Sequence, residues 1–164
     1  MLRAVWSAIS RETPPPFTEP GPQMSIQDLI DDFSYLDDWE DRYKYVIELG
    51  KKLDPLSADE HNDETKVQGC VSQVWLVCEP AGDGGTLSFR GDSDALIVRG
   101  LIAILLTMYS GKAPKDILDI DARRVFEQLG LNEHLSPQRS NGLHAMVARI
   151  REDAARQLAG AHTD

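Results

Sequence analysis

The segment from Leu96 to Tyr109 carries apolar side chains almost all the way around the helix that its sequence predicts. A helix that is apolar on every face is typical of a protein interior, where other elements cover it. Asp92 or Ser93, just before it, is a candidate N-cap, and Gly111 follows as a stop signal. This segment therefore predicts a domain assembled around one central, buried helix.

The residues before this helix predict a β-hairpin. Val74 to Val77 form a short apolar run typical of a buried strand, which we expect to extend to about Cys78. The glycine-rich segment from Pro80 to Gly85 predicts a turn, and Thr86 to Arg90 alternates as a returning strand does. The hairpin would place two antiparallel strands directly ahead of the central helix.

Helical periodicity appears on both sides of the hairpin. Helices, a small antiparallel sheet and then more helices are the order of an α+β domain, with the sheet packed against helices from both ends of the chain. The flanking helices are expected after Ser25, after Asp37, at Pro114, after Asp121 up to a stop at Gly130, and from a start between Ser136 and Asn141.

The first 23 residues differ in composition from the rest of the chain. Five prolines are clustered there, at positions 14, 15, 16, 20 and 22. Such a segment cannot bury enough apolar surface to fold, so residues 1–23 are expected to form a disordered extension. The remaining residues, 24–160, match the usual prior of about 100–200 residues for a single domain.

Charge and hydropathy exclude two kinds of partner. The chain has 164 residues, of which 17 are basic and 27 acidic, and its formal net charge is −10. Nucleic-acid binding requires clustered Lys and Arg that neutralise phosphates, so a nucleic-acid partner is not expected. The longest apolar run, Leu101 to Met108, is far shorter than the roughly 18 residues of a membrane span. We therefore expect no membrane association.

The chain contains two cysteines, Cys70 and Cys78. Along a continuous strand they would lie ~27 Å apart at about 3.3 Å per residue, too far for a disulfide. Reduced thiols are typical of a cytoplasmic protein. Cys78 is expected to be a small core residue. The four histidines match no standard zinc spacing, and two cysteines are too few for a closed metal site or an iron–sulfur cluster.

Cys70 is the candidate reactive group. Gly69 precedes it and permits a tight or left-handed backbone conformation. The strand that begins a few residues later makes this a loop held by a rigid scaffold, where reactive groups are often found. Only the thiolate is a good nucleophile, so its surroundings decide the reactivity. Taken alone, a buried structural cysteine is the commoner role of this residue type.

Four short blocks extend the context of Cys70. They are Asp38–Tyr43 with Ile47–Lys51; Val67–Trp75; Gly91–Ala95 with Ile97–Ala103; and His134–Pro137 with Arg139–Leu143 and Met146. In this order, and over about residues 25–156, they resemble the SufE family of sulfur-acceptor proteins. The resemblance implies a SufE/IscU-like α+β fold.

The resemblance also implies a function. SufE-like proteins accept sulfane sulfur from a pyridoxal-phosphate cysteine desulfurase, of the SufS or CsdA type, and stimulate that enzyme. They carry the sulfur as a cysteine persulfide and pass it to an iron–sulfur cluster scaffold. The family's acceptor corresponds to Cys70, which would be persulfidated without an independent catalytic cycle. Pyridoxal phosphate belongs to the desulfurase, so we expect no cofactor of this chain's own.

Further expectations follow from the family for the surroundings of Cys70. The idle thiol would be tucked into an apolar hollow, and its loop would move outward when the desulfurase binds. The positions expected to orient this loop or to face the desulfurase are Gly69, Ser72, Asp92, Ser93, Asp94 and Arg139. The chain is expected to be a monomer or a homodimer.

Two other functions remain open from the residues alone. A thiol oxidoreductase or peroxidase would need Cys70 in a Cys-x-x-Cys pair, or next to a base that holds the thiol ionised, and neither is visible. A cluster scaffold of the IscU type has a related fold, but would need more thiolate ligands than this chain supplies.

Overall fold

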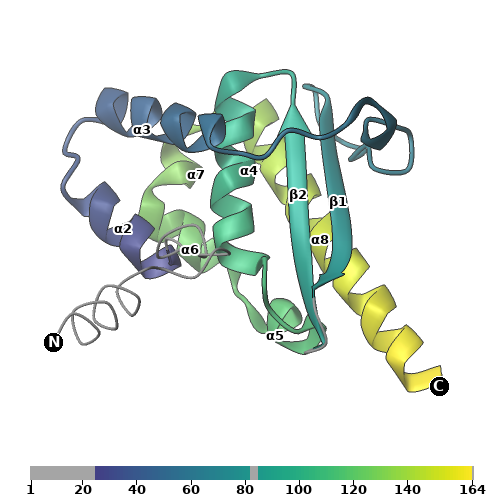
Figure 1. The fold of residues 1–164 in the computed structure, drawn as a ribbon. Helices are drawn as coiled ribbons and strands as arrows, with labels where there is room; N and C mark the ends of the chain where they lie inside the picture. Colours follow the sequence, from purple (N-terminus) through teal and green to yellow (C-terminus); the bar gives the residue numbers. More distant parts are fainter. Residues whose placement is uncertain (1–24, 82–84, 164) are drawn as a thin grey trace, which may run out of the picture.

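The computed structural model describes residues 25–81 and 85–163 (Figure 1). The extension predicted over residues 1–23 lies outside the described residues, as does the centre of the hairpin turn. The elements are α2 (Ile26–Ser34), α3 (Trp39–Lys51), the 3₁₀ helix η1 (Ala58–Glu60), β1 (Val74–Ala81), β2 (Thr86–Ser93), α4 (Leu96–Tyr109), α5 (Pro114–Asp119), α6 (Ala122–Leu129), α7 (Leu131–His134) and α8 (Pro137–Thr163). Their order confirms the α+β prediction.

The two strands form an antiparallel hairpin, paired from Val74 opposite Ser93 to Ala81 opposite Thr86. Each strand is longer than its side-chain pattern predicts, reaching Ala81 rather than Cys78 and Ser93 rather than Arg90. The reason is that backbone pairing satisfies N–H and C=O groups whatever the side chains are, so the ladder continues where apolar alternation has ended.

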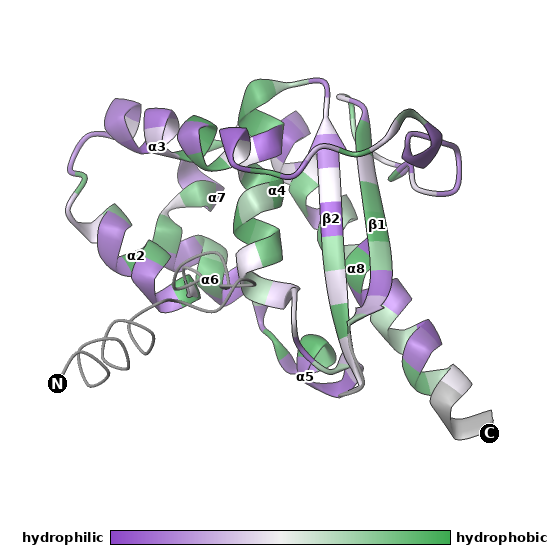
Figure 2. Ribbon diagram, viewed as in Figure 1, coloured by the Kyte–Doolittle hydropathy of each residue, from purple (hydrophilic) through white to green (hydrophobic). Residues whose placement is uncertain are grey.

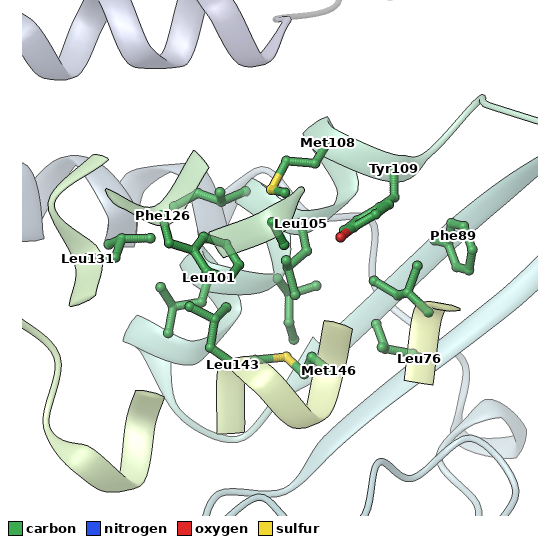
Figure 3. Close-up of a cluster of buried hydrophobic side chains, with 14 of the residues drawn as sticks. Leu76, Phe89, Leu101, Leu105, Met108, Tyr109, Phe126, Leu131, Leu143 and Met146 are labelled. Atoms are coloured by element: carbon green, nitrogen blue, oxygen red, sulfur yellow. The ribbon is translucent and has the colours of Figure 1, made fainter. Parts of the chain in front are cut away.

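Helix α4 is the centre of the fold, as its sequence predicts. Nine of its side chains or glycines are buried, and Figure 2 shows it as the most continuously hydrophobic element, whereas α3 and the η1 segment are largely hydrophilic. Figure 3 shows the buried side chains around it: Leu101, Leu105 and Met108 with Phe126 and Leu131 on one side, Leu143 and Met146 of α8 on another, and Leu76 and Phe89 of the hairpin at one end. Within the described residues, no helix combines the length and apolarity needed to cross a membrane.

The N-cap predicted for α4 is wrong. Strand β2 continues through Ser93, so the helix begins at Leu96 with Ala95 as its N-cap and no side-chain cap hydrogen bond. Asp92 instead contacts other side chains, and Ser93 Oγ accepts the N–H of Ala95 at 3.2 Å. The other starts and stops hold closely: Ser25 and Asp121 are N-caps, Gly130 ends α6 with φ +72°, and α3 is capped by Asp38, one residue after Asp37.

Helices α3 and α4 cross at unusually close range through two glycines. A Cβ at Gly100 would lie 2.1 Å from the carbonyl oxygen of Val46, and a Cβ at Gly50 would lie 2.6 Å from the N of Gly100. Real Cβ atoms do not approach other atoms so closely, so only glycine fits at this crossing. The contact fixes α3 against the N-terminal half of α4, close to where the chain leaves the hairpin.

Candidate functional site

Cys70 lies in a loop whose two ends are joined by backbone hydrogen bonds at the start of β1. The N–H of Val67 donates to the carbonyl of Val74, and the N–H of Leu76 donates to the carbonyl of Thr65, both at 2.8 Å. Within the loop, Gly69 has φ +91°, a backbone conformation that favours glycine, as predicted. The sequence thus folds locally into a closed loop that projects Cys70 from the start of the hairpin.

The thiol of Cys70 is half-buried against the N-terminal part of α8. Its Sγ donates a hydrogen bond to the carbonyl of Gly142 at 3.6 Å, a sulfur-type distance. A Cβ at Gly142 would lie 3.6 Å from Sγ, so this glycine brings the helix backbone itself to the sulfur. Sequence reasoning placed Gly142 in a family block but assigned it no contact, because nothing local indicates that α8 returns to the loop.

A hollow of about 310 Å³ opens beside the sulfur. Its walls come from the Cys70 loop, β1, α4 and the beginning of α8, so apolar and polar groups share the lining and the hollow is more polar than the family resemblance implies. The lining residues are Cys70, Val71, Ser72, Val74, Val98, Leu101, Ser136, Gln138, Arg139, Gly142 and Met146. Val71 is exposed next to the thiol, so an apolar side chain also faces solvent there.

Burial raises the pKa of the Cys70 thiol above its ordinary value. The neutral thiol is the form that can donate to the Gly142 carbonyl, so the hydrogen bond and the raised pKa both favour S–H over thiolate. In this position the sulfur is protected, because the thiolate is the nucleophile. The thiol is therefore less reactive here than a fully exposed cysteine would be.

We therefore expect iodoacetamide alkylation of Cys70 to rise with pH along a curve displaced to higher pH than that of the unfolded chain. The physical reason is that a raised pKa leaves less thiolate at any pH near neutrality. Mass spectrometry of the Cys70 peptide after timed labelling, in buffer and in urea, measures both curves. A folded curve that inflects at or below the urea curve would contradict this prediction.

The residues predicted to accompany Cys70 divide into two groups. Gly69 is in the loop, and Ser72 and Arg139 line the hollow, Arg139 being exposed. Asp94 is not in the hollow but holds the loop's far end, since its Oδ1 accepts the N–H of Gln73 at 3.0 Å and its own N–H donates to the Gln73 carbonyl at 3.3 Å.

Asp92 and Ser93 do not line the hollow. Asp92 accepts from His61 Nε2 at 2.9 Å and pairs with Arg99 at 3.3 Å, while Ser93 is buried at the end of β2. The hydrogen bond to Asp92 raises the pKa of His61. These two positions therefore stabilise the junction between β2 and α4, and any part in orienting the Cys70 loop is indirect.

The acidic segment before the loop, Asp54–Glu64, is mostly exposed but is tied to the hairpin by a few side chains. It contains η1, and Arg90 of β2 pairs with Glu60 and with Glu79. The hydrogen bond from Arg90 lowers the pKa of Glu60 to about 2. Together with the His61–Asp92 contact, this pairing holds the segment against the hairpin, so the loop that follows starts from a fixed base.

Cys78 does not line the hollow. We predicted a core residue, but its side chain is only half-buried. It lines an open groove of about 900 Å³ between β1 and α8. Burial, with a smaller effect of the nearby Asp153 charge, raises the pKa of its thiol to about 11. Across the described segments, no three His, Cys, Asp or Glu side chains gather in a way that could hold a metal ion.

The family can be decided by comparison with known proteins. Residues 27–154 match the family model of SufE, described as an Fe-S metabolism associated domain. This chain belongs to the SufE family. The resemblance read from the four sequence blocks is thereby confirmed, and the chain has a place in iron–sulfur metabolism.

Two relatives agree with this assignment, and a solved structure matches the fold. An uncharacterized SufE-like protein of Rhizobium etli is 58% identical over 132 residues, covering 79% of this chain and 89% of the relative. One from Rhizobium meliloti is 53% identical over 136 residues, covering 82% and 97%. The solution structure of a hypothetical protein from Thermus thermophilus matches the fold with a TM-score of 0.66 at 20% identity, covering 83% of this chain and 99% of that one.

Proposed function

We propose that this SufE-family protein accepts sulfur from a cysteine desulfurase onto Cys70 and delivers it for iron–sulfur cluster assembly. The observation that carries the proposal is the position of the Cys70 sulfur, half-buried beside a hollow of about 310 Å³ on a loop closed at both ends. A thiol in such a place can be sheltered at rest and presented when its loop moves.

The transfer is a thiol–persulfide exchange. The Cys70 thiolate attacks the outer sulfur of the desulfurase persulfide, a new S–S bond forms at Cys70, and the donor's inner sulfur leaves as a thiolate. The proton lost from Cys70 goes to solvent or to the departing thiolate. No oxidant is needed, because the oxidised sulfur arrives from the donor. An acceptor thiol on the downstream scaffold repeats the same attack.

The hollow would shelter the persulfide sulfur that Cys70 carries. Apolar side chains of Val74, Val98 and Leu101 would surround the outer sulfur and limit its contact with other thiols and oxidants. The raised pKa of Cys70 lowers its thiolate fraction in this position, so outward displacement of the loop by the desulfurase would activate the thiol. Pyridoxal phosphate and carbon–sulfur cleavage are supplied by that enzyme, so this chain has no catalytic cycle of its own. Both cysteines are free, which suits a reducing cytoplasm.

The decisive experiment is to load the protein with sulfur. After incubation with a purified cysteine desulfurase and L-cysteine, the Cys70 peptide is expected to gain the mass of one sulfur atom, and reductant should remove it. Samples without desulfurase, and without L-cysteine, are the controls. An unmodified Cys70 peptide beside a loaded Cys78 peptide would overturn the proposal.

A further inference from the structure

One face of α8 follows the Cys70 loop from the thiol back to its base. Four residues of the helix, spaced by three, four and four positions, lie on this face. Gly142 accepts from the thiol, and the Cβ of Ala145 would lie 3.4 Å from a Cβ at Gly69. Arg149 reaches further back along the chain, and Asp153 pairs with Arg149.

Arg149 makes the strongest of these contacts. Its Nη1 donates to the carbonyl of Lys66 at 3.2 Å, and its Nη2 donates to the carbonyl of Glu64. Both carbonyls belong to the segment that enters the loop. A guanidinium is suited to hold two carbonyls at once because its donors are fixed in a planar fork, and charged donors form stronger hydrogen bonds than neutral ones.

Asp153 fixes the orientation of this arginine. Its carboxylate is buried, with 8% of the residue exposed, and accepts from Arg149 Nε at 3.4 Å and from Arg156 Nη2 at 2.8 Å. A carboxylate removed from water needs such partners. Arg156 is 64% exposed at its side chain, and its contacts are with Asp153 and Glu152 on the same helix. It therefore shares the carboxylate with Arg149 without contacting the loop.

We infer that Arg149 is a positioning residue that keeps the Cys70 loop closed over the hollow, acting through the carbonyls of Glu64 and Lys66. Asp94, between β2 and α4, holds the opposite end of the loop at Gln73, so the two ends are held by distant parts of the chain. The role of this restraint in sulfur transfer rests on the proposed function. The restraint itself is a property of the free protein and can be measured without a desulfurase.

The test compares Arg149→Met with Arg156→Met. Both variants lose one positive charge and one partner of Asp153. Only Arg149→Met also loses the hydrogen bonds to the carbonyls of Glu64 and Lys66. In Arg149→Met, hydrogen exchange of residues 67–72 and alkylation of Cys70 are each expected to quicken about tenfold, as loss of a charged hydrogen bond predicts. Arg156→Met should match the wild type in both measurements. Arg149→Lys, which keeps one charged donor group, should fall between them.

Hydrogen exchange in α4 reports global unfolding in the same samples, so the loop must accelerate more than α4 does. Equal loop exchange and equal Cys70 alkylation in the two methionine variants would overturn the inference. So would acceleration of the loop and α4 by the same factor, because Arg149 would then be a general stabilising residue. Sulfur loading of the wild type is measured separately, so a failure of the proposed function is distinguishable from a failure of this restraint.

Discussion

Replacement of Cys70 by serine is expected to reduce desulfurase stimulation to the rate of the desulfurase alone. The hydroxyl retains the size of the side chain and can still donate to the Gly142 carbonyl, so the loop should stay in place. A serine hydroxyl is weakly nucleophilic without an adjacent base, whereas a cysteine is a few per cent thiolate near neutrality and intrinsically very nucleophilic. Sulfide release from L-cysteine, with and without the variant, measures the loss.

Cys78→Ser is the matched control, since it removes the only other cysteine at a position outside the hollow. It is expected to stimulate the desulfurase as the wild type does. Binding of Cys70→Ser to the desulfurase should also persist, because the substitution leaves the protein surface almost unchanged. Full stimulation by Cys70→Ser would refute a direct role of this sulfur.

The order of helices and strands was predictable because it depends on local sequence patterns, such as hydrophobic periodicity and capping residues. The all-round apolarity of α4 requires a buried position, whatever covers it, and the structure buries it. Asp121 and Gly130 mark the two ends of α6 by their own hydrogen bonding and backbone conformation. Cys70 was singled out by Gly69 and the following strand, together with the resemblance to SufE. Each of these signals extends over a few residues, which is why a single sequence carries it.

Contacts between distant segments were not predictable in this way. His61 meets Asp92 across 31 positions, and Arg149 meets Glu64 across 85. No local pattern specifies such pairs, because they depend on how finished elements are placed against one another. The same reason explains the wrong N-cap for α4. Asp92 is of a residue type that often caps helices, but here its carboxylate pairs with His61 and with Arg99. Nothing in the sequence around Arg149 distinguishes it from the other charged residues of α8.

The close crossing of α3 and α4 gives the largest stability effect that we expect. Gly100→Ala would place its methyl 2.1 Å from the Val46 carbonyl oxygen and 2.5 Å from a Val46 side-chain carbon. The obstructing oxygen belongs to helix backbone, so the two helices must separate to relieve the overlap. Overpacking of a dense interior costs up to about 3 kcal/mol, and a backbone obstruction belongs at the upper end of that range.

Urea unfolding followed by far-UV circular dichroism measures this loss as a lower midpoint with an unchanged slope. Gly160→Ala is the matched control, because it makes the same substitution in α8 with nothing within 4 Å of the new methyl. Alanine favours a helix over glycine by about 0.8–1.0 kcal/mol, so this variant should be as stable as the wild type or more so. If Gly100→Ala unfolded at the wild-type midpoint, the helices could not be in contact at this glycine, and the placement of α3 beside α4 would be wrong.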